Sequence, residues 1–513
     1  MANYLVGTDI GTSGTKSVVM SEEGRVLGSA YIEYPLITPR PGWAEQDPEW
    51  YWNATADTIR EAVRKANVDA AEIRGVSVSA FSPTCILVDR NLNPLANAHI
   101  WMDRRGTAEA EWILETFGEE HASAKSANTV DPYYGNVKFL WEKRNRPELY
   151  RKTYKFLTPS DYATMRLTGK AVTDYSNASI FGMGFDMTSR CWDEAALDEL
   201  GLEREKLPEI FPCEEVIGEV TPAAAERTGL KAGTPVCAGG VDCNAAFVAN
   251  GGIHDGDISI AMGTAGCMGY MHREPQFGER LINIIHSGLS KEMYVTLGAT
   301  VSCGALTRYF RNEFGQLEKQ TAAQLGIDEY EIMNLEAEQV PVGSDGLIVL
   351  PYFMGERTPF WNPLARGVMF GMSLAHTRGH VYRAFIEGAT YALYQNFLKI
   401  LESGAKPNYP MILTEGGAKS RLWRQIVADM FDIPVAYMKD SKGAPVGNAI
   451  SAGVGTGVFQ SYDVVDGWVD FSDRYEPNAK VHEEYMKYYE IFCRLYDEVK
   501  PEFGALAKAT GYL

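Results

Sequence analysis

The sequence has no long apolar run. None of its segments approaches about 18 uninterrupted apolar residues, the length that a membrane-spanning helix needs. The N-terminal segment MANYLVGTDIG lacks the basic region and the long apolar region of a secretion signal. We therefore expect a soluble protein of the cytoplasm without a membrane partner.

The cysteine and histidine motifs that hold metal ions are missing as well. The eight cysteines are scattered and include no C-x-x-C pair, which argues against a zinc ribbon and a disulfide framework. The eight histidines include no H-E-x-x-H motif. We expect no protein-bound transition metal, and we expect most cysteines to be small buried residues in a reducing compartment.

Positive charge is scarce. The chain has 48 Lys and Arg against 67 Asp and Glu, which gives a net charge of −19. A protein that binds nucleic acid depends on basic residues that contact the phosphate backbone. The composition therefore argues against a nucleic acid partner and favours small ligands that are recognised locally.

The length of 513 residues and the hydrophobic content of 45% are enough for two cores. We expect an α/β protein with two domains, residues 1–246 and 247–513, and place the boundary close to the segment GGVDCNAAFVANGG. Helices are expected where apolar residues recur at helical spacing, over residues 47–67, 136–150, 420–431 and 482–499. Asp47 would cap the first of these, and the aromatic stripe of the last would face the core.

A Gly-rich turn near the N-terminus joins two strands. YLVGTDIG reads as a strand, Gly11-Thr12-Ser13-Gly14 as a turn, and SVVM as a second strand. A P-loop or a dinucleotide-binding fingerprint needs a helix after its turn, and a P-loop also needs Gly before its Lys. Here a strand follows the turn instead of a helix, which argues against both motifs, and Thr15 in place of Gly before Lys16 argues further against a P-loop.

The same pattern returns in the second half. GDISIAMGTAGCMGYM is again strand, turn and strand, with Gly263-Thr264-Ala265-Gly266 at the turn. Two short G-T-x-G strings could match by chance, but the shared flanking strands argue for a duplication. We expect two halves around a central cleft, each with a hairpin that faces phosphate groups.

Two carboxylates lie where strands end. Asp9 comes just before the first turn and could hold hydrated Mg²⁺ beside phosphate oxygens, or simply cap its own turn. Asp242 follows a strand and two glycines, so it could act as general base toward a substrate hydroxyl. The backbone and hydroxyls of Thr12, Ser13 and Gly14, with the charge of Lys16, would bind phosphate.

Two further segments could contact ligands. Trp101 and Asp103 in IWMDRRG combine an aromatic ring with hydrogen-bonding groups, which suits a polyhydroxylated ligand, although a surface ion-pair loop is the alternative. Gly416 and Gly417 in LTEGGAKSRLW would let a flat ring such as adenine approach the backbone.

In this order, the motifs resemble those of the FGGY family of carbohydrate kinases, in the superfamily of actin, Hsp70 and the sugar kinases. DIGTSGTK, GGVDCNAA, MGTAG, TVSCGALTRYF, LPYFMGERTPFWNPLARG and EGGAKSRLW carry the resemblance, which covers residues 3 to 500. It implies two duplicated ribonuclease H-like domains around a cleft. It also implies phosphorylation of a sugar or polyol by ATP with Mg²⁺, and it favours a homodimer.

The resemblance assigns roles residue by residue. Asp242 would be the general base, and Asp9 would hold Mg²⁺ through water. The remaining assignments are to phosphate (Thr12, Ser13, Gly14, Lys16, Gly263 and Thr264), to the nucleotide (Gly304, Gly416, Gly417 and Ala418) and to the sugar (Ser82, Trp101, Asp103 and Tyr133).

Departures from the family patterns bear on the substrate. Glycerol kinases have an Arg-Glu pair where this chain has Ser82 and Pro83, so glycerol is not expected. One xylulokinase type has Gln-Met-His-Gly where residues 81–84 read FSPT, which puts D-xylulose in doubt without excluding it. The rest of the chain is closer to xylulokinases, so we expect a pentulose or another linear sugar or polyol. Kinases of erythritol or tetrulose, gluconate or ribulose are the alternatives, as are a non-kinase ATPase and a sugar sensor.

Overall fold

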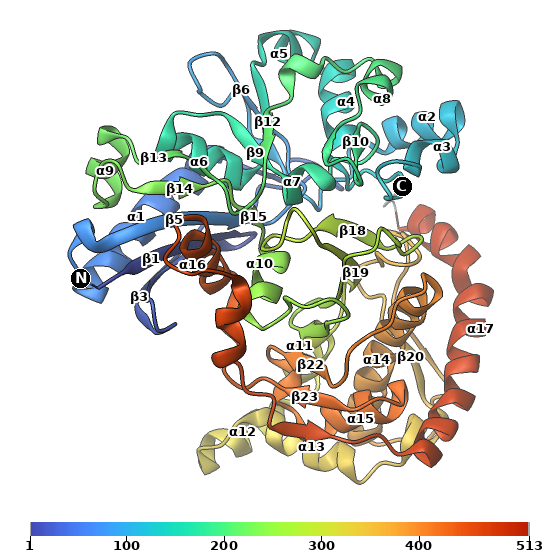
Figure 1. Ribbon diagram of the computed structural model, residues 1–513. Helices are drawn as coiled ribbons and strands as arrows, with labels where there is room; N and C mark the ends of the chain where they lie inside the picture. The colour runs from blue at the N-terminus through green and yellow to red at the C-terminus, as the bar shows by residue number, and fades with distance from the viewer. Residues whose placement is uncertain (1, 511–513) are drawn as a thin grey trace.

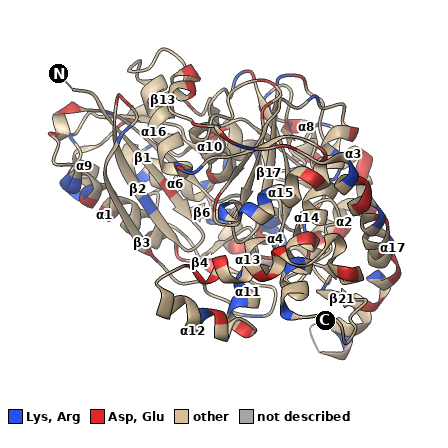
Figure 2. Cartoon of the chain, turned by 90° about the horizontal axis from the view of Figure 1, so that it is seen from below, with Lys and Arg blue, Asp and Glu red and all other residues tan. Residues whose placement is uncertain are grey.

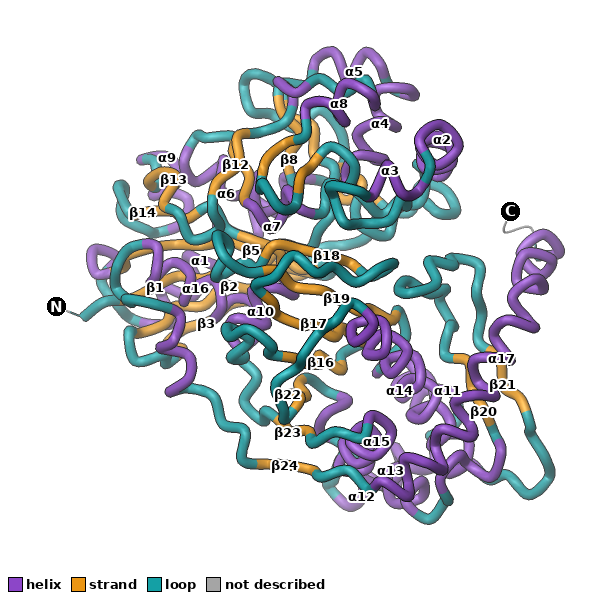
Figure 3. Tube along the Cα trace, turned by 45° about the vertical axis from the view of Figure 1, so that its right-hand side comes forward, coloured by secondary structure: helices purple, strands orange, loops and turns teal. Residues whose placement is uncertain are grey.

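Two mixed sheets of seven strands form the centre of the protein, one in each half of the chain, in a computed structural model that describes residues 2–510 (Figures 1 and 3). The strands of the N-terminal sheet are β1 (Tyr4–Gly11), β2 (Gly14–Ser21), β3 (Val26–Glu33), β5 (Ile73–Ala80), β13 (Val216–Glu219), β14 (Pro235–Cys237) and β15 (Gly240–Val241). The strands of the C-terminal sheet are β16 (Ile258–Met262), β17 (Gly266–His272), β18 (Ile282–Ile285), β19 (Tyr294–Thr300), β22 (Met411–Thr414), β23 (Val435–Tyr437) and β24 (Asp473–Tyr475).

The two sheets repeat one topology, which confirms the predicted duplication. Strands β1, β2 and β3 are antiparallel neighbours, and β1 is also parallel to β5. Likewise β16, β17 and β19 are antiparallel neighbours, and β16 is parallel to β22. Each sheet continues through a further parallel strand, β14 or β23, to an antiparallel edge strand, β13 or β24. Both halves therefore have the ribonuclease H-like arrangement that the sequence predicted.

Most helices pack outside these sheets, and small strand pairs join the loops (Figure 3). The helices are α1 (Pro48–Ala66), α2 (Thr107–Phe117), α3 (Glu119–Ser123), α4 (Gly135–Asn145), α5 (Pro147–Lys152), α6 (Pro159–Thr168), α7 (Tyr175–Ser179), α8 (Glu194–Leu200), α9 (Pro222–Thr228), α10 (Asp242–Ala249), α11 (Gly304–Glu313), α12 (Gln316–Leu325), α13 (Glu329–Glu338), α14 (Arg378–Glu402), α15 (Arg421–Phe431), α16 (Gly443–Gly455) and α17 (Ala479–Ala509). The small strands are β4 (Glu45–Gln46), β6 (Ile86–Val88), β7 (Ala98–His99), β8 (Lys155–Leu157), β9 (Val172–Asp174), β10 (Phe185–Asp186), β11 (Cys191–Trp192), β12 (Glu209–Phe211), β20 (Ile348–Leu350) and β21 (Val368–Phe370).

The helices expected from the sequence are present, with one difference. Asp47 caps α1 as predicted, since its side chain accepts a hydrogen bond from the Glu49 N–H. The segment expected as one helix over residues 136–150 is instead two, α4 and α5, which meet at Arg146. Pro147 follows Arg146 and disfavours helical backbone at the residue before it.

The long C-terminal helix α17 contributes to the core of the second half. The side chains of Tyr485, Phe492 and Tyr496 are buried in one cluster with β22 and α14, while Tyr489 packs against it half-buried. The outer side of α17 carries charged residues of both signs, which Figure 2 shows as alternating red and blue segments. No helix within residues 2–510 is both long and apolar enough to cross a membrane.

Helix α16 comes from the second half of the chain but lies against β1 and β5 of the first sheet (Figure 1). Two glycines permit this close packing. A Cβ at Gly7 would lie 1.8 Å from the Pro445 carbonyl oxygen, and a Cβ at Gly447 would lie 1.9 Å from the Ala245 carbonyl oxygen of α10. The base of the region between the sheets is therefore built from both halves, by α10 and α16 together.

Candidate active site

The first hairpin ends in a two-residue turn. Gly11 pairs with Gly14, so Thr12 and Ser13 form the tip, and Ser13 and Lys16 are exposed. The backbone of the turn is fixed from outside, because Gln46 Nε2 donates to the Thr12 carbonyl oxygen at 2.8 Å. The hydroxyls, backbone N–H groups and ammonium expected to bind phosphate are thus gathered at one turn.

Asp9 lies at the end of β1, directly before this turn. Its Oδ1 accepts a 2.7 Å hydrogen bond from the Ser79 hydroxyl of β5, and the Ser79 oxygen in turn accepts one of 2.7 Å from Asn448 Nδ2 of α16. Burial and the nearby charge of Asp242 raise the pKa of Asp9 to about 7, although Ser79 and Lys16 oppose the shift. Ser79 and Asn448 were missed in the sequence, which has no local signal for a contact between segments so far apart.

Asp242 is the first residue of α10, and it follows the strand β15 as expected. Its Oδ1 accepts a 2.6 Å hydrogen bond from the Cys243 N–H. Burial raises its pKa, and the guanidinium of Arg357 works against that increase. Since the charge of Asp242 acts on Asp9, the structure brings together the two carboxylates predicted from separate motifs.

The second hairpin turns at residues 263–265 and is fastened to the start of α11. The carbonyl oxygen of Thr264 accepts hydrogen bonds from the N–H groups of Cys303 and Ala305, at 3.0 and 3.1 Å. The Gly304 N–H donates to the Gly263 carbonyl oxygen at 2.8 Å, and a Cβ at Gly304 would lie only 2.6 Å from that oxygen. Gly304 is therefore the residue that lets α11 begin against the turn.

A cavity of about 500 Å³ opens beside the second hairpin. Its wall includes five of the residues predicted to hold the nucleotide or its phosphates, namely Gly263, Thr264, Gly304, Gly416 and Gly417. This volume lies within the range of about 300–1,000 Å³ that is usual for small-molecule sites. The sequence did not identify other residues of the wall, among them Arg308, Asp328, Tyr330, Asn334 and Tyr382.

Ala418 differs from its predicted neighbours. Its side chain is fully buried in the core of the second half and is not part of the cavity wall. The short 3₁₀ helix Gly417–Lys419 turns the methyl group inward while the two preceding glycines stay at the cavity. The methyl group of Ala418 therefore packs in the core, and a contact of this residue with the nucleotide, which its backbone could make, stays a prediction.

The segment predicted to bind the sugar contacts the first hairpin. Trp101 Nε1 donates a 3.0 Å hydrogen bond to the Thr12 hydroxyl, which joins this segment to the phosphate turn. The Tyr133 hydroxyl donates to the Ser82 carbonyl oxygen at 3.1 Å, and the buried Ser82 hydroxyl has no hydrogen-bond partner within the described chain. The Ser82 hydroxyl could therefore form a hydrogen bond with a substrate that binds near Trp101 and Tyr133.

Asp103 does not face this region. Its carboxylate is buried with 1% exposure, and both oxygens accept hydrogen bonds from protein donors, the Ala44 N–H and the backbone and guanidinium of Arg105. Arg105 and Lys138 hold the pKa of Asp103 below its usual value, against the effect of burial. In this arrangement the Asp103 carboxylate is bonded to the backbone of Ala44 and Arg105, and its contact with a sugar stays a prediction.

Arg357 is a residue that the sequence interpretation quoted in GERTPFWN but did not single out. Its guanidinium lies over the Trp101 ring, 5.2 Å from the ring centre, although Trp101 belongs to the first half. Its charge also acts on Asp242, Tyr133 and Cys267. The local sequence FMGERT has no distinctive spacing, so only the tertiary contact identifies Arg357.

The donors around Asp9 fit a hydrated magnesium ion. Magnesium prefers one or two carboxylates together with waters and phosphate oxygens. Oδ1 of Asp9 is oriented by Ser79, and the charges of Lys16 and Asp242 both act on this carboxylate. A single carboxylate at this position is the arrangement expected for an ion held through water.

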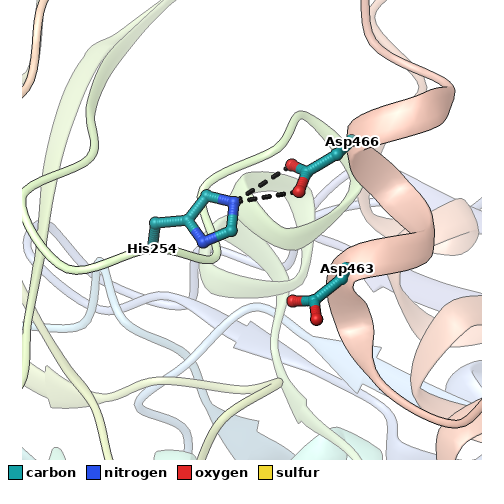
Figure 4. Close-up of side chains that lie close together, drawn as sticks. All are labelled: His254, Asp463 and Asp466. Atoms are coloured by element: carbon teal, nitrogen blue, oxygen red, sulfur yellow. Dashed lines mark hydrogen bonds and ion pairs between the residues drawn. The ribbon is translucent and has the colours of Figure 1, made fainter.

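Another set of possible metal ligands lies elsewhere. His254, Asp463 and Asp466 are exposed, with His254 Nε2 3.1 Å from both carboxylate oxygens of Asp466 (Figure 4). The histidine is thus already paired with a carboxylate, and the set belongs to neither hairpin. We assign it no role in the reaction.

One histidine pair, His376 and His380, has the H-x-x-x-H spacing that can hold zinc on a helix. His376 precedes α14, which begins at Arg378, so the two do not share a helical face. Their Nδ1 atoms accept hydrogen bonds from the N–H groups of Ser373 and Thr377, at 2.8 and 3.1 Å. Both rings serve as caps of local turns.

Comparison with known proteins follows the same division into halves. The model of the FGGY family of carbohydrate kinases, N-terminal domain, matches residues 4–249, and that of the C-terminal domain matches residues 258–456. The chain is 30% identical over 499 residues to a xylulose kinase of Bacillus subtilis (strain 168), covering 97% of both chains. It is 31% identical over 507 residues to a gluconokinase of the same organism, covering 99% of this chain and 98% of the relative.

Solved structures have the same fold. The crystal structure of a xylulose kinase from Rhodospirillum rubrum has a TM-score of 0.86 at 28% identity and covers 98% of this chain and 100% of its own. That of a gluconate kinase from Lactobacillus acidophilus has a TM-score of 0.90 at 24% identity, with coverage of 99% and 100%. At 24% identity, the similarity to the gluconate kinase structure shows a shared fold only.

Proposed function

Because the chain belongs to the FGGY family of carbohydrate kinases, we propose that it transfers the γ-phosphoryl group of ATP to a hydroxyl of a linear sugar or polyol. The observation that carries this proposal is that Asp9, beside the phosphate turn, and Asp242, at the start of α10, lie close enough for the charge of Asp242 to act on Asp9. A protein that only bound sugar would need no such base, so the pairing favours a working kinase over a sugar sensor.

Asp242 is the proposed general base. It would take the proton of the attacking hydroxyl as the new O–P bond forms, and ADP would leave with the electrons of the broken bond. The two turns would hold the phosphates in line through Thr12, Ser13, Gly14 and Lys16 on one side and Gly263 and Thr264 on the other. Alignment and charge stabilisation account for most of the catalysis in phosphoryl transfer, so no covalent intermediate is required.

Asp9 would hold Mg²⁺ through water, with Ser79 fixing its carboxylate. When bound, the ion would neutralise charge on the phosphate oxygens. The cavity beside Gly304, Gly416 and Gly417 would take the adenosine part of ATP. Movement of the two halves toward each other would exclude water from the reacting groups and limit ATP hydrolysis.

For the acceptor we propose a pentulose such as D-xylulose first and an aldonate such as D-gluconate second. The similarity to the xylulose kinase and to the gluconokinase is nearly equal, which supports both. The free hydroxyl of Ser82 and the absence of a charged pair at Ser82-Pro83 suit a neutral acceptor that forms hydrogen bonds. Erythritol or tetrulose and ribulose belong to the same chemical range.

The test is a coupled assay of ADP release with ATP, Mg²⁺ and a panel of acceptors: D-xylulose, D-ribulose, erythritol, D-gluconate and glycerol. We expect stimulation by D-xylulose or D-gluconate at least tenfold above the rate with water alone, and none by glycerol. Absence of stimulation by every acceptor would contradict the proposal. A response to glycerol alone would show that the interpretation of Ser82 and Pro83 is wrong.

Three further expectations belong to this proposal. The lobes would be residues 1–246 and 247–513, with α16 reaching from the second into the first. The reaction would take place in the reducing cytoplasm, which suits the eight free cysteines. The family resemblance favours a homodimer, which light scattering of the purified chain would test.

A further inference from the structure

The segment Glu356–Trp361 belongs to the second half of the chain and contains Arg357, whose charge acts on the proposed general base Asp242. The guanidinium of Arg357 lies 5.2 Å from the centre of the Trp101 ring, and Trp101 is itself hydrogen-bonded to Thr12 of the phosphate turn. The charge of Arg357 favours the ionised form of Asp242. Arg357 therefore contacts the ring that is bonded to the phosphate turn, and its charge acts on the proposed general base.

This segment is held firmly on the side of the second half. The buried Glu356 carboxylate accepts hydrogen bonds from the Thr300 hydroxyl at 2.6 Å and from the Val301 N–H at 2.9 Å. The Thr358 hydroxyl accepts a hydrogen bond from the Ala299 N–H at 2.6 Å. Since residues on both sides of Arg357 are fastened to β19 and the loop after it, the guanidinium is presented from a fixed backbone.

The same segment also touches the first half. The Trp361 ring packs against Tyr133 and Tyr134, each with ring centres 5.8 Å apart. Arg357 is thus positioned by contacts to both halves, through Trp101 and through Trp361. A cation in this position reaches the active site only when the two halves are arranged as they are here.

The groups around Asp242 indicate what the Arg357 cation does there. The groups that act on Asp242 or on its neighbours are Asp9, Cys243, Cys267, Tyr133 and Arg357. Of these only Arg357 is positive, while Lys16 acts on Asp9 from the first hairpin. The Nε of Arg357 is buried and has no hydrogen-bond partner within the described residues. A buried N–H donor without a partner is costly, so a bound acceptor is expected at this guanidinium.

We propose that Arg357 is a catalytic residue that binds the phosphoryl group while it passes from ATP to the hydroxyl held at Asp242. This inference rests on the proposed kinase function. The hydroxyl oxygen forms a bond to phosphorus, its proton passes to Asp242, and the bond from phosphorus to the bridging oxygen of ADP breaks, with its electron pair leaving on ADP. The planar, fork-like guanidinium matches the oxygens of the group in transfer, and charge stabilisation at this point is the main requirement of the reaction.

A carboxylate of an aldonate substrate would offer the same chemistry to Arg357. We favour the phosphoryl group, because the guanidinium lies over Trp101, which is hydrogen-bonded to the phosphate turn, and its charge acts on Asp242, where the reacting hydroxyl would be held. If Arg357 instead bound a substrate carboxylate, its loss would affect D-gluconate and leave D-xylulose unchanged. The two acceptors therefore separate the two sources of negative charge.

The first experiment does not depend on the acceptor. Calorimetry would measure the affinity for Mg·ADP with and without aluminium tetrafluoride, which mimics a phosphoryl group in transfer. We expect the parent to bind Mg·ADP at least tenfold more tightly with the fluoride, and Arg357→Gln to lose this gain while its affinity for Mg·ADP alone stays within about twofold. A parent without the gain, or a variant that keeps it, would overturn the proposal.

The second experiment measures steady-state kinetics with D-xylulose and with D-gluconate, using whichever acceptor the parent phosphorylates. Arg357→Gln should lower kcat about 10²- to 10³-fold, the usual loss when one donor to a developing charge is removed, with little change in KM for ATP. Arg357→Lys keeps the charge but not the fork and should recover part of the loss. A rise in the acceptor KM alone, at unchanged kcat, would overturn the catalytic role.

A matched control is Arg366→Gln. Arg366 lies five residues after this segment, and its guanidinium donates hydrogen bonds to the carbonyl oxygens of Pro363 and Ala365. We expect kcat within about twofold of the parent for this variant. An equal loss in both arginine variants would mean that the effect comes from disturbing the segment, and it would overturn the proposal. If the parent phosphorylates neither sugar, the proposed acceptors are wrong, while the fluoride experiment still decides on Arg357.

Discussion

The Ser79 hydroxyl donates a 2.7 Å hydrogen bond to Oδ1 of Asp9. The Ser79 hydroxyl oxygen in turn accepts a 2.7 Å hydrogen bond from Asn448 Nδ2, which also donates to the Thr8 carbonyl oxygen at 2.7 Å. A helix of the second half of the chain thereby fixes the carboxylate of the first half for which we propose magnesium binding. The orientation of Asp9 depends on the contact between the halves and not on its own hairpin alone.

Removal of this hydroxyl should weaken the enzyme at neutral pH. In Ser79→Ala the Asp9 carboxylate loses a hydrogen bond that lowers its pKa, so the carboxylate becomes protonated at higher pH. We expect kcat/KM to fall at least about tenfold at pH 7, since a hydrogen bond to a charged group contributes about 1.5–3 kcal/mol. The acid limb of the pH profile should also move to higher pH.

Ser77→Ala is the control for that variant. Ser77 is buried on the same strand, and its hydroxyl has no hydrogen-bond partner within the described residues. Its kcat/KM and pH profile should match those of the parent. Equal effects of the two substitutions would show that strand packing, and not the bond to Asp9, determines the result.

The buried charge of Asp9 should make the ligand-free protein less stable at high pH. Its pKa is about 7 in the folded protein, above the ordinary value, so between these values the folded state binds more protons than the unfolded chain. The contribution of Asp9 to stability is therefore complete at acid pH and is lost as the pH rises through about 7.

Asp9→Asn removes this dependence. Without nucleotide and magnesium, we expect its Tm relative to the parent to be higher at pH 8 than at pH 5 by a few degrees, measured by calorimetry. A difference between variant and parent that does not change with pH would show that Asp9 titrates at its ordinary value.

Loss of the proposed base should separate catalysis from nucleotide binding. Asp242→Asn keeps the size of the side chain but cannot accept the hydroxyl proton, so kcat should fall about 10²- to 10⁴-fold. The Kd for ATP, measured by calorimetry, should stay within about threefold of the parent value. If the variant turns over near the parent rate, another group is the base.

Asp103→Asn should act on folding more than on sugar binding. Asp103 and Arg105 form an ion pair whose side chains are both 1% exposed. Arg105 keeps its ion pair with Glu45 at 2.7 Å in this variant, so the expected cost is that of a lost hydrogen bond between charged groups, about 1.5–3 kcal/mol. Urea unfolding should show this loss, whereas unchanged stability with a raised sugar KM would restore Asp103 to the substrate surface.

Two glycines of the nucleotide region should respond differently to alanine. In Gly304→Ala the new methyl group would meet the Gly263 carbonyl oxygen at 2.6 Å, so the second hairpin must shift and the KM for ATP should rise about tenfold or more. Gly416→Ala would place its methyl group in open space. Its Tm should stay within about 1 °C of the parent, while that of Gly304→Ala falls; equal Tm values would contradict this reading of the hairpin contact.

The sequence by itself determined the features that depend on short stretches. A turn rich in Gly and Thr between two apolar strands specifies a hairpin wherever the chain places it, and this pattern occurs twice, at Thr12 and at Thr264. The duplication, the positions of Asp9 and Asp242 at strand ends and the cap at Asp47 follow from such local patterns. Local turn and strand preferences were sufficient because each involves only a few neighbouring residues.

The tertiary structure alone decided the contacts between distant segments. Only the folded structure shows that Asp103 forms a buried ion pair with Arg105 and that the side chain of Ala418 lies in the core. Packing brought Asn448 to Ser79 and Arg357 to Trp101, across the two halves. A residue's burial and its long-range partners depend on how the sheets and helices pack, and this packing is not encoded in the spacing of residues along any single segment.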